Sequence, residues 1–315
     1  MLTNFWQQLK KPIIGLCPMD GVTDEPMRQI QCQIAKPDVV YTEFVSVEGF
    51  VRKPEVFLKK LAFMENERPI VVQVFGETPD DFYNVVKQLC GMGFDGIDIN
   101  MGCPAKSVVL RGGGAALIGN YDLSEKIINQ CQKAIADSGK NLLLSVKTRI
   151  GSRGVTTKDW IAFLSKFPLA EVTVHGRVLK QVNAGPVNWE EIEIASRILK
   201  EKMIACLGNG GIKSISEARK QCQKYNLDGI LIGQIALGNP WVFKEGYCPT
   251  KKEIFEIILK HGMMAWDFYG EKGFVTVLKH FSWYPKGFRG SKEFKRQLLQ
   301  TRNIDEVKKI VDSFA

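Results

Sequence analysis

Short apolar runs alternate with amphipathic segments along the first 245 residues. Eight runs of four to six residues have the length and the enrichment in valine, isoleucine and leucine that are typical of buried strands. They lie at 13–16, 39–42, 70–75, 96–100, 142–147, 171–175, 204–208 and 229–232. Apolar residues recur every three or four positions between them, as in 79–92 and 124–138, which predicts helices.

Eight strand–helix units within about 230 residues predict an α/β fold, the (β/α)8 TIM barrel, over residues 1–245. A doubly wound parallel sheet is the alternative. That fold usually carries Gly-x-Gly-x-x-Gly after its first strand, which this chain lacks. The barrel is therefore favoured.

The pattern changes at 246–250, a plausible linker containing glycine and proline. Beyond it, Ile254, Ile257, Ile258 and Trp266 recur at helical spacing, and 291–312 predicts one or two further helices. A short run at 274–278 is the one ambiguous strand signal. We expect a small all-helical C-terminal domain over residues 246–315.

Composition narrows the class of protein. The apolar fraction of 45% and charged fraction of 24% are ordinary for a globular protein, and no apolar run approaches the roughly 20 residues that span a bilayer. The N-terminal charges follow the apolar residues, the wrong order for a secretory signal. We expect a cytoplasmic protein, a monomer without a membrane partner.

Charge and cysteine usage add two expectations. The formal net charge of +9 favours a polyanionic partner such as nucleic acid. None of the eight cysteines forms a Cys-x-x-Cys pair or has a nearby histidine, so no metal site is expected and the thiols should be reduced.

The segment 98–106 carries the strongest candidate for chemistry. Gly102 permits a tight turn after a predicted strand, and Pro104 favours an extended backbone at Cys103. A glycine-rich basic loop, 111–114, follows. A thiol at a strand end suggests acid–base or nucleophilic chemistry, although a small buried cysteine in a turn is the simpler alternative for the segment alone.

Other strand ends carry polar groups or glycines. The turns 208–211 and 233–234 follow the seventh and eighth strands, where barrels commonly bind phosphate through backbone N–H groups. Lys147 and His175 end strands and are candidates for the mouth, while His175 is equally well explained as a structural residue. Gln73 is either a ligand-binding amide or a core amide bonded to a neighbouring strand.

These segments together resemble the flavin-dependent tRNA-dihydrouridine synthases. The signature is Asp98-Ile-Asn-Met-Gly-Cys-Pro104, and the resemblance covers nearly the whole chain. Further matches are Pro18-Met19, 21–24, Thr42-Glu43, Gln73 with Gly76, 146–151, 175–177, 208–211, Ile232-Gly233 and 279–287.

The resemblance implies a TIM-barrel reductase of specific uridines in tRNA, with FMN as cofactor and NADPH as reductant. Reduced FMN would deliver hydride to C6 of the uracil, and Cys103 would protonate C5 as a general acid. The implied FMN site comprises Pro18, Met19, Asp20, Gln73, Lys147, His175, Asn209, Gly210, Gly211, Gly233 and Gln234. Asn100, Arg149 and Arg177 are the candidates to contact uracil or RNA. Which uridine is reduced is not indicated by any motif.

Two departures from the family pattern bear on the FMN site. Asp20 stands where the family has a small residue, and Gln234 where it has arginine. The second change removes a charge-assisted phosphate contact, which backbone amides and Arg177 would have to replace. Val178 and Asn183 also replace the family's usual Thr and Tyr.

The C-terminal region favours RNA independently of the resemblance. Nine Lys or Arg face three acids between 279 and 309, a surplus of six, and Lys292, Lys295 and Arg296 share one predicted helical face. Five aromatic residues, at 281, 283, 284, 288 and 294, lie among them as possible platforms for bases. Two alternatives remain: an FMN barrel reductase of a small molecule, such as a dihydroorotate-type dehydrogenase or an ene-reductase, and a non-catalytic RNA-binding protein.

Overall fold

The computed structural model describes residues 4–152 and 154–315. Nine parallel strands form one sheet in the order β1-β9-β8-β7-β6-β5-β4-β2, with β3 also paired to β4. Their bounds are β1 Ile13–Leu16, β2 Val40–Tyr41, β3 Val45–Ser46, β4 Ile70–Phe75, β5 Gly96–Asn100, β6 Leu143–Arg149, β7 Glu171–His175, β8 Ala205–Asn209 and β9 Gly229–Ile232.

The sheet closes on itself because the backbone N–H of Leu16 donates to the carbonyl of Val39, beside β2. The structure thus confirms the predicted (β/α)8 TIM barrel, with β2 and β3 sharing the second strand position along β4. The predicted strand 39–42 is shorter than expected, and β3 was not predicted. Two residues are too few for a recognisable alternation of apolar and polar positions.

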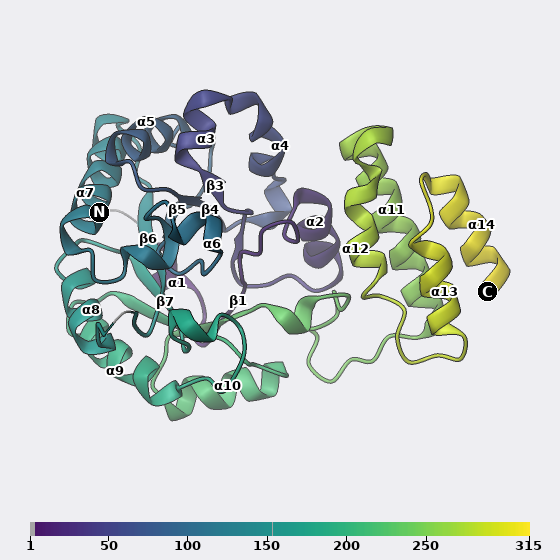
Figure 1. Cartoon of the computed structure of the whole chain (residues 1–315). Coiled ribbons are helices and arrows are strands. Elements are labelled where there is room, and N and C mark those ends of the chain that lie inside the picture. Colours follow the sequence, from purple (N-terminus) through teal and green to yellow (C-terminus); the bar gives the residue numbers. More distant parts are fainter. Residues whose placement is uncertain (1–3, 153) are drawn as a thin grey trace.

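Helices surround the barrel (Figure 1). Each buries an apolar stripe against the strands; Phe82, Val85, Val86 and Leu89 of α5 are fully buried, for example. The longer ones are α2 Glu25–Ile34, α5 Pro79–Leu89, α7 Tyr121–Asp137, α8 Thr157–Leu164, α9 Trp189–Lys200 and α10 Ile215–Lys224. The shorter α1 Phe5–Gln8 precedes β1, and α3 Val47–Arg52, α4 Leu58–Leu61 and α6 Lys106–Val109 lie in connections.

After β9 the described chain is helical. The helices are α11 Lys251–Gly273, α12 Leu278–Phe281, α13 Ser291–Leu298 and α14 Ile304–Phe314, which we call the C-terminal bundle. The bundle lies to one side of the barrel, next to α2 (Figure 1). Thr250 and Glu253 form a capping box that starts α11, and the ambiguous run at 274–278 begins as a 3-10 turn rather than a strand.

The bundle has a core of its own that continues into the barrel. Phe255, Phe281, Phe294 and Leu298 are buried there together with Ile30 of α2. Phe281, Tyr284 and Phe294 therefore pack inside the bundle, and their predicted role as platforms for bases is wrong. A small helical unit needs large apolar side chains to form a core at all. Trp283 and Phe288 remain partly exposed.

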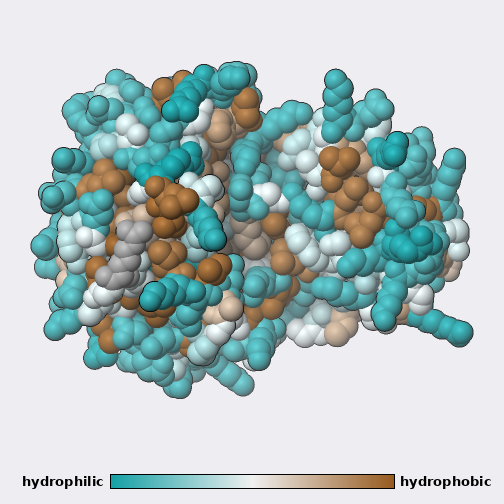
Figure 2. Space-filling view, in the orientation of Figure 1, coloured by the Kyte–Doolittle hydropathy of each residue, from teal (hydrophilic) through white to brown (hydrophobic). Residues whose placement is uncertain are grey.

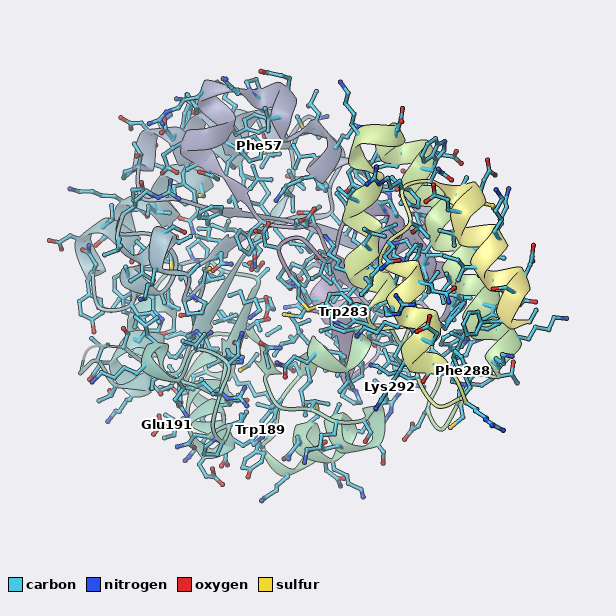
Figure 3. All side chains as sticks on the ribbon, turned by 45° about the vertical axis from the view of Figure 1, so that its right-hand side comes forward. Phe57, Trp189, Glu191, Trp283, Phe288 and Lys292 are labelled. Atoms are coloured by element: carbon cyan, nitrogen blue, oxygen red, sulfur yellow. The ribbon has the colours of Figure 1, made fainter. Side chains whose placement is uncertain are left out.

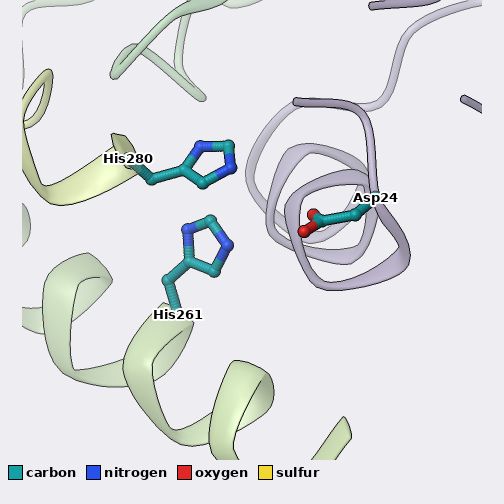
Figure 4. Close-up of side chains that lie close together, drawn as sticks. All are labelled: Asp24, His261 and His280. Atoms are coloured by element: carbon teal, nitrogen blue, oxygen red, sulfur yellow. The ribbon is translucent and has the colours of Figure 1, made fainter. Parts of the chain in front are cut away.

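A buried polar cluster joins the barrel to the bundle. The Asp24 carboxylate accepts hydrogen bonds from the Met27 backbone N–H at the start of α2 and from the Tyr269 hydroxyl of α11. His261 and His280, from α11 and α12, point their rings toward Asp24 (Figure 4). These three residues have the composition of a metal site, but both Asp24 oxygens are already hydrogen-bonded and the positively charged Lys279 lies nearby.

None of the helices formed by the described residues is long and apolar enough to cross a membrane. Figure 2 shows a mostly hydrophilic surface, with apolar patches on both the barrel and the bundle.

Candidate active site

A pocket of about 290 Å³ opens at the carboxyl ends of the barrel strands. Strand geometry explains the convergence, because parallel strands end at the same rim and bring their last side chains together. Thirteen predicted residues line it: Pro18, Met19, Asn100, Cys103, Lys147, Arg149, His175, Arg177, Asn209, Gly210, Gly211, Gly233 and Gln234.

Other predicted residues lie elsewhere. The exposed Asp20 side chain pairs with Lys60 at 2.7 Å, and Gln73 is buried below the pocket. Lys292, Lys295 and Arg296 lie on α13 and do not line the pocket. Figure 3 shows Lys292 on the bundle, with Trp283 nearer to the barrel. Arg296 is held by Glu293 at 2.6 Å, while the Lys292 side chain is exposed.

Seven further lining residues were not predicted to belong to the site: Cys17, Phe44, Gly102, Pro104, Asn183, Ile212 and Leu231. Cys17 directly follows β1, so the rule that strand ends carry the site could have found it. Phe44 sits between β2 and β3, where the strand pattern gave no warning of the interruption.

Cys103 sits on a turn that other side chains hold in place. The Asn100 side-chain oxygen accepts hydrogen bonds from the backbone N–H groups of Gly102 and Cys103, at 3.0 and 2.8 Å. Asn100 therefore caps this turn, the alternative to direct contact with a ligand. The Cys103 thiol is partly buried, and this burial raises its pKa. A hydrogen bond from the backbone N–H of Ala105 and the positive charge of Arg149 reduce the increase. The thiol is protonated at neutral pH.

Arg149 is buried and engaged with the protein itself. Its Nε donates to the carbonyl of Gly102 and one terminal nitrogen donates to the carbonyl of Val182, both at 2.7 Å. Burial lowers the pKa of its guanidinium to about 10. Arg149 thus ties the Cys103 turn to the loop after β7, which limits its freedom to reach an RNA phosphate.

His175 is a neutral imidazole. Burial, together with the positive charges of Lys147, Arg149 and Arg177, lowers its pKa to about 2. Its Nδ1 is buried and has no hydrogen-bond partner in the part of the chain that the structure describes. A buried nitrogen without a hydrogen-bond partner costs free energy, so Nδ1 of His175 fits a ligand that offers a hydrogen bond.

The loop after β8 forms a cradle with no side chains. Gly210 and Gly211 have φ values of +116° and +68°. A Cβ at these positions would lie 3.0 Å from Nε2 of His175 and 2.9 Å from Val187, respectively. Only glycine fits there, which leaves backbone N–H groups exposed to an anion beside Arg177.

Lys147 completes the polar lining. Its ammonium donates to the side-chain oxygen of Asn209 at 3.2 Å, and the Asn209 amide donates to the carbonyl of Leu231 at 2.9 Å. The mouth thus combines a lysine, a neutral histidine, a glycine cradle and a protonated thiol. This set fits a planar ligand with a phosphate tail next to a group that receives a proton.

Comparisons with known proteins agree with this arrangement. The family model "Dihydrouridine synthase (Dus)" matches residues 15–315. The chain belongs to the dihydrouridine synthase family. Membership makes it an FMN-dependent oxidoreductase, and the pocket residues described above fit such a cofactor.

Individual relatives match over nearly their whole length. A "Probable tRNA-dihydrouridine synthase" of Staphylococcus aureus (strain COL) is 33% identical over 323 residues, covering 100% of this chain and 96% of the relative. A "Probable tRNA-dihydrouridine synthase 2" of Bacillus subtilis (strain 168) is 30% identical, with 100% and 97% covered. Among solved structures, a variant of NCR from Zymomonas mobilis shares the fold, with a TM-score of 0.51, 16% identity, and 75% and 88% covered.

Proposed function

We propose that this protein reduces specific uridines of tRNA to 5,6-dihydrouridine, with FMN as cofactor and NADPH as the reductant, in the cytoplasm. The observation that carries the proposal is the Cys103 turn: a thiol held protonated at the mouth of a dihydrouridine synthase barrel. Relatives named for tRNA support the substrate. NADPH rests on the family resemblance.

The pocket residues divide into a cofactor side and a substrate side. Gly210, Gly211 and the turn at Gly233-Gln234 would hold the FMN phosphate, with Arg177 supplying positive charge. Lys147 and the neutral His175 would contact the flavin ring, and Pro18 and Met19 would pack against it. A reduced FMN held by these residues would supply the hydride for C6 of the uracil.

Cys103 would then give its proton to C5. Burial keeps the thiol protonated before transfer, and the positive charge of Arg149 stabilises the thiolate that remains. His175 is not the acid, because at a pKa of about 2 it carries no proton to give as an imidazolium near neutral pH. Asn100 holds the Cys103 turn, so the donor stays aimed at the mouth.

The C-terminal bundle, within residues 246–315, would bind the body of the tRNA. Its support is the surplus of six positive charges between 279 and 309, with Lys292 exposed on α13. The target base must leave its stack to reach a pocket at the bottom of the barrel mouth. Trp283, at the barrel side of the bundle (Figure 3), is partly exposed and would be available to contact RNA.

The test is a single-turnover reaction. Protein containing FMN is reduced with NADPH without oxygen and mixed with tRNA that lacks dihydrouridine. We expect the flavin to be reoxidised with matching formation of dihydrouridine, which mass spectrometry would map to the modified position. Reoxidation no faster with tRNA than without it, or faster with orotate or an enone, would favour the small-molecule reductase instead.

A further inference from the structure

A chain of side-chain hydrogen bonds runs from the barrel interior to the Cys103 turn. Asp98 and Asn100 lie two residues apart on β5 and so face the same side, into the barrel. Gln73 lies opposite Asp98 in the pairing of β4 with β5. Its amide nitrogen donates to the Asp98 carboxylate at 2.7 Å, and its oxygen accepts from the Asn100 amide at 2.9 Å.

The order of donors and acceptors along this chain is set at its buried end. Burial raises the pKa of the Asp98 carboxyl to about 6, so the group is mostly ionised near neutral pH and then only accepts hydrogen bonds. Ser145 already donates to the other Asp98 oxygen at 2.7 Å. Gln73 must therefore turn its NH2 group toward Asp98 and its oxygen toward Asn100. Asn100 must in turn offer its NH2 to Gln73, which leaves its oxygen for the backbone N–H groups of Gly102 and Cys103.

A reversed amide at either position would disrupt the turn. If Gln73 were flipped, its oxygen would face the carboxylate of Asp98. If Asn100 were flipped, its NH2 group would face the N–H groups of Gly102 and Cys103. All three side chains are buried, so water would not readily compensate such a mismatch. One acidic group thus orients two amides and, through them, the segment that carries the thiol.

We propose that Asp98 is a positioning residue that fixes the Cys103 turn for proton transfer, acting through Gln73 and Asn100. The inference rests on the proposed function, in which Cys103 is the proton donor. Neither Asp98 nor Gln73 is among the described residues that line the pocket. Asp98 is fully buried, so its effect on the reaction passes through its neighbours.

Two substitutions at Asp98 separate positioning from bulk structure. In Asp98→Asn the carboxamide oxygen still accepts from Gln73 and its NH2 faces the Ser145 hydroxyl, so the order of the chain survives. In Asp98→Ala the acceptor is lost. Single-turnover reduction of tRNA should stay near the wild-type rate in Asp98→Asn and fall by up to about 100-fold in Asp98→Ala, the cost of misplacing a reacting group by about 1 Å.

A matched control and a second readout accompany them. Ser145→Ala removes the other hydrogen bond to Asp98 but leaves the chain to Cys103, and should keep the wild-type rate. FMN content and reduction of the flavin by NADPH should be unchanged in all three variants. Alkylation of Cys103 by iodoacetamide, followed on its own peptide by mass spectrometry, should be faster in Asp98→Ala because the loosened turn exposes the thiol.

The alkylation readout does not depend on the reaction with tRNA. If wild-type protein fails to reduce tRNA, the proposed function fails while alkylation still tests the positioning. A folded Asp98→Ala protein with wild-type tRNA reduction and wild-type alkylation would overturn the inference, as would equal losses in Asp98→Asn and Asp98→Ala. If Asp98→Ala does not fold, Gln73→Met interrupts the same chain at similar volume, and unchanged alkylation of Cys103 there would overturn it too.

Discussion

The barrel mouth and the C-terminal bundle use the same kinds of residue for different purposes. At the mouth, Arg149 and His175 are buried and lie close to one another, and burial lowers the pKa of both side chains. On α13, Lys292 extends into solvent and Arg296 pairs with Glu293 one turn away. Buried charges act strongly on a bound ligand, whereas exposed charges are screened and act in sum. The proposed function therefore assigns the chemistry to the first region and the docking of tRNA to the second.

The sharpest test of this division is Cys103→Ala. Removing the acid should slow reduction of tRNA by about 10²–10⁴-fold, the usual worth of a positioned general acid. Affinity for tRNA and flavin reduction by NADPH should be unchanged, because neither needs a proton at C5. Rapid-mixing measurements of the two half-reactions provide the comparison. A wild-type rate of tRNA reduction in the alanine variant would show that another group supplies the proton.

Charge reversal on the bundle should instead weaken tRNA binding and leave the flavin site intact. Replacing Lys292, Lys295 and Arg296 by glutamate should weaken tRNA binding by about 10- to 100-fold and flatten its dependence on salt, since each lost phosphate contact removes about 0.7–0.9 from the log–log slope. FMN content should persist. Reversal at Lys126 and Lys133 of α7, across the barrel from the bundle (Figure 1), is the control.

If the triple variant keeps wild-type affinity and salt dependence, the RNA docks elsewhere. The barrel rim is then the candidate, through Lys106 and Arg111, both exposed beside the Cys103 turn. Arg149 no longer belongs to that surface, because its guanidinium is bonded to Gly102 and Val182.

Acid should destabilise the junction between the two regions. Burial, with Lys279 adding to it, lowers the pKa of His261 to about 3 from about 6.5 in an unfolded chain. The folded state keeps this histidine neutral, whereas the unfolded chain binds a proton there below pH 6.5. The free energy of unfolding is therefore unaffected by His261 above pH 6.5 and decreases as the pH falls toward 3. At pH 5 the loss is about 2 kcal/mol relative to pH 7.5.

His261→Gln removes the titrating group, so the difference in unfolding free energy between pH 7.5 and pH 5 should shrink by that amount. Urea unfolding at the two pH values measures it. The same pH dependence in the variant and the wild type would mean that His261 is not kept neutral on folding.

The smallest expected effect concerns the flavin. Lys147→Ala should weaken FMN binding by about tenfold, the worth of one charge-assisted hydrogen bond, and lower the reduction potential, because a cation near N1 favours the reduced anionic ring. Spectroelectrochemical titration reports the potential. A potential equal to or above that of the wild type, in a folded variant, would remove Lys147 from this role.

Much of the barrel was predictable because its strands are continuous apolar runs with polar or glycine residues at their ends. This pattern located Cys103, Lys147, His175 and the Gly210–Gly211 cradle at one mouth. The insertion that contains β3, α3 and α4 was not predicted, because its elements are too short for a period to show.

The sequence could not show which polar and aromatic side chains are buried. Arg149 and the bundle aromatics look alike in the sequence as RNA-binding candidates, yet Arg149 braces the Cys103 turn and Phe294 fills a core. Asp20 lies next to the predicted cofactor residues but turns outward to Lys60. Whether a side chain faces a ligand, a neighbour or solvent depends on tertiary contacts that spacing alone does not encode.

The shared helix α2 has a consequence for engineering. Its N-terminal Asp24 bonds to Tyr269 of α11, and its Ile30 belongs to the bundle core. The chain leaves the barrel at the linker 246–250. In the packing, however, α2 belongs with the bundle as well as with the barrel, although it precedes the linker in the sequence. A chimera that exchanges the C-terminal bundle between relatives should therefore carry α2 with the incoming bundle, or redesign both faces of the joint together.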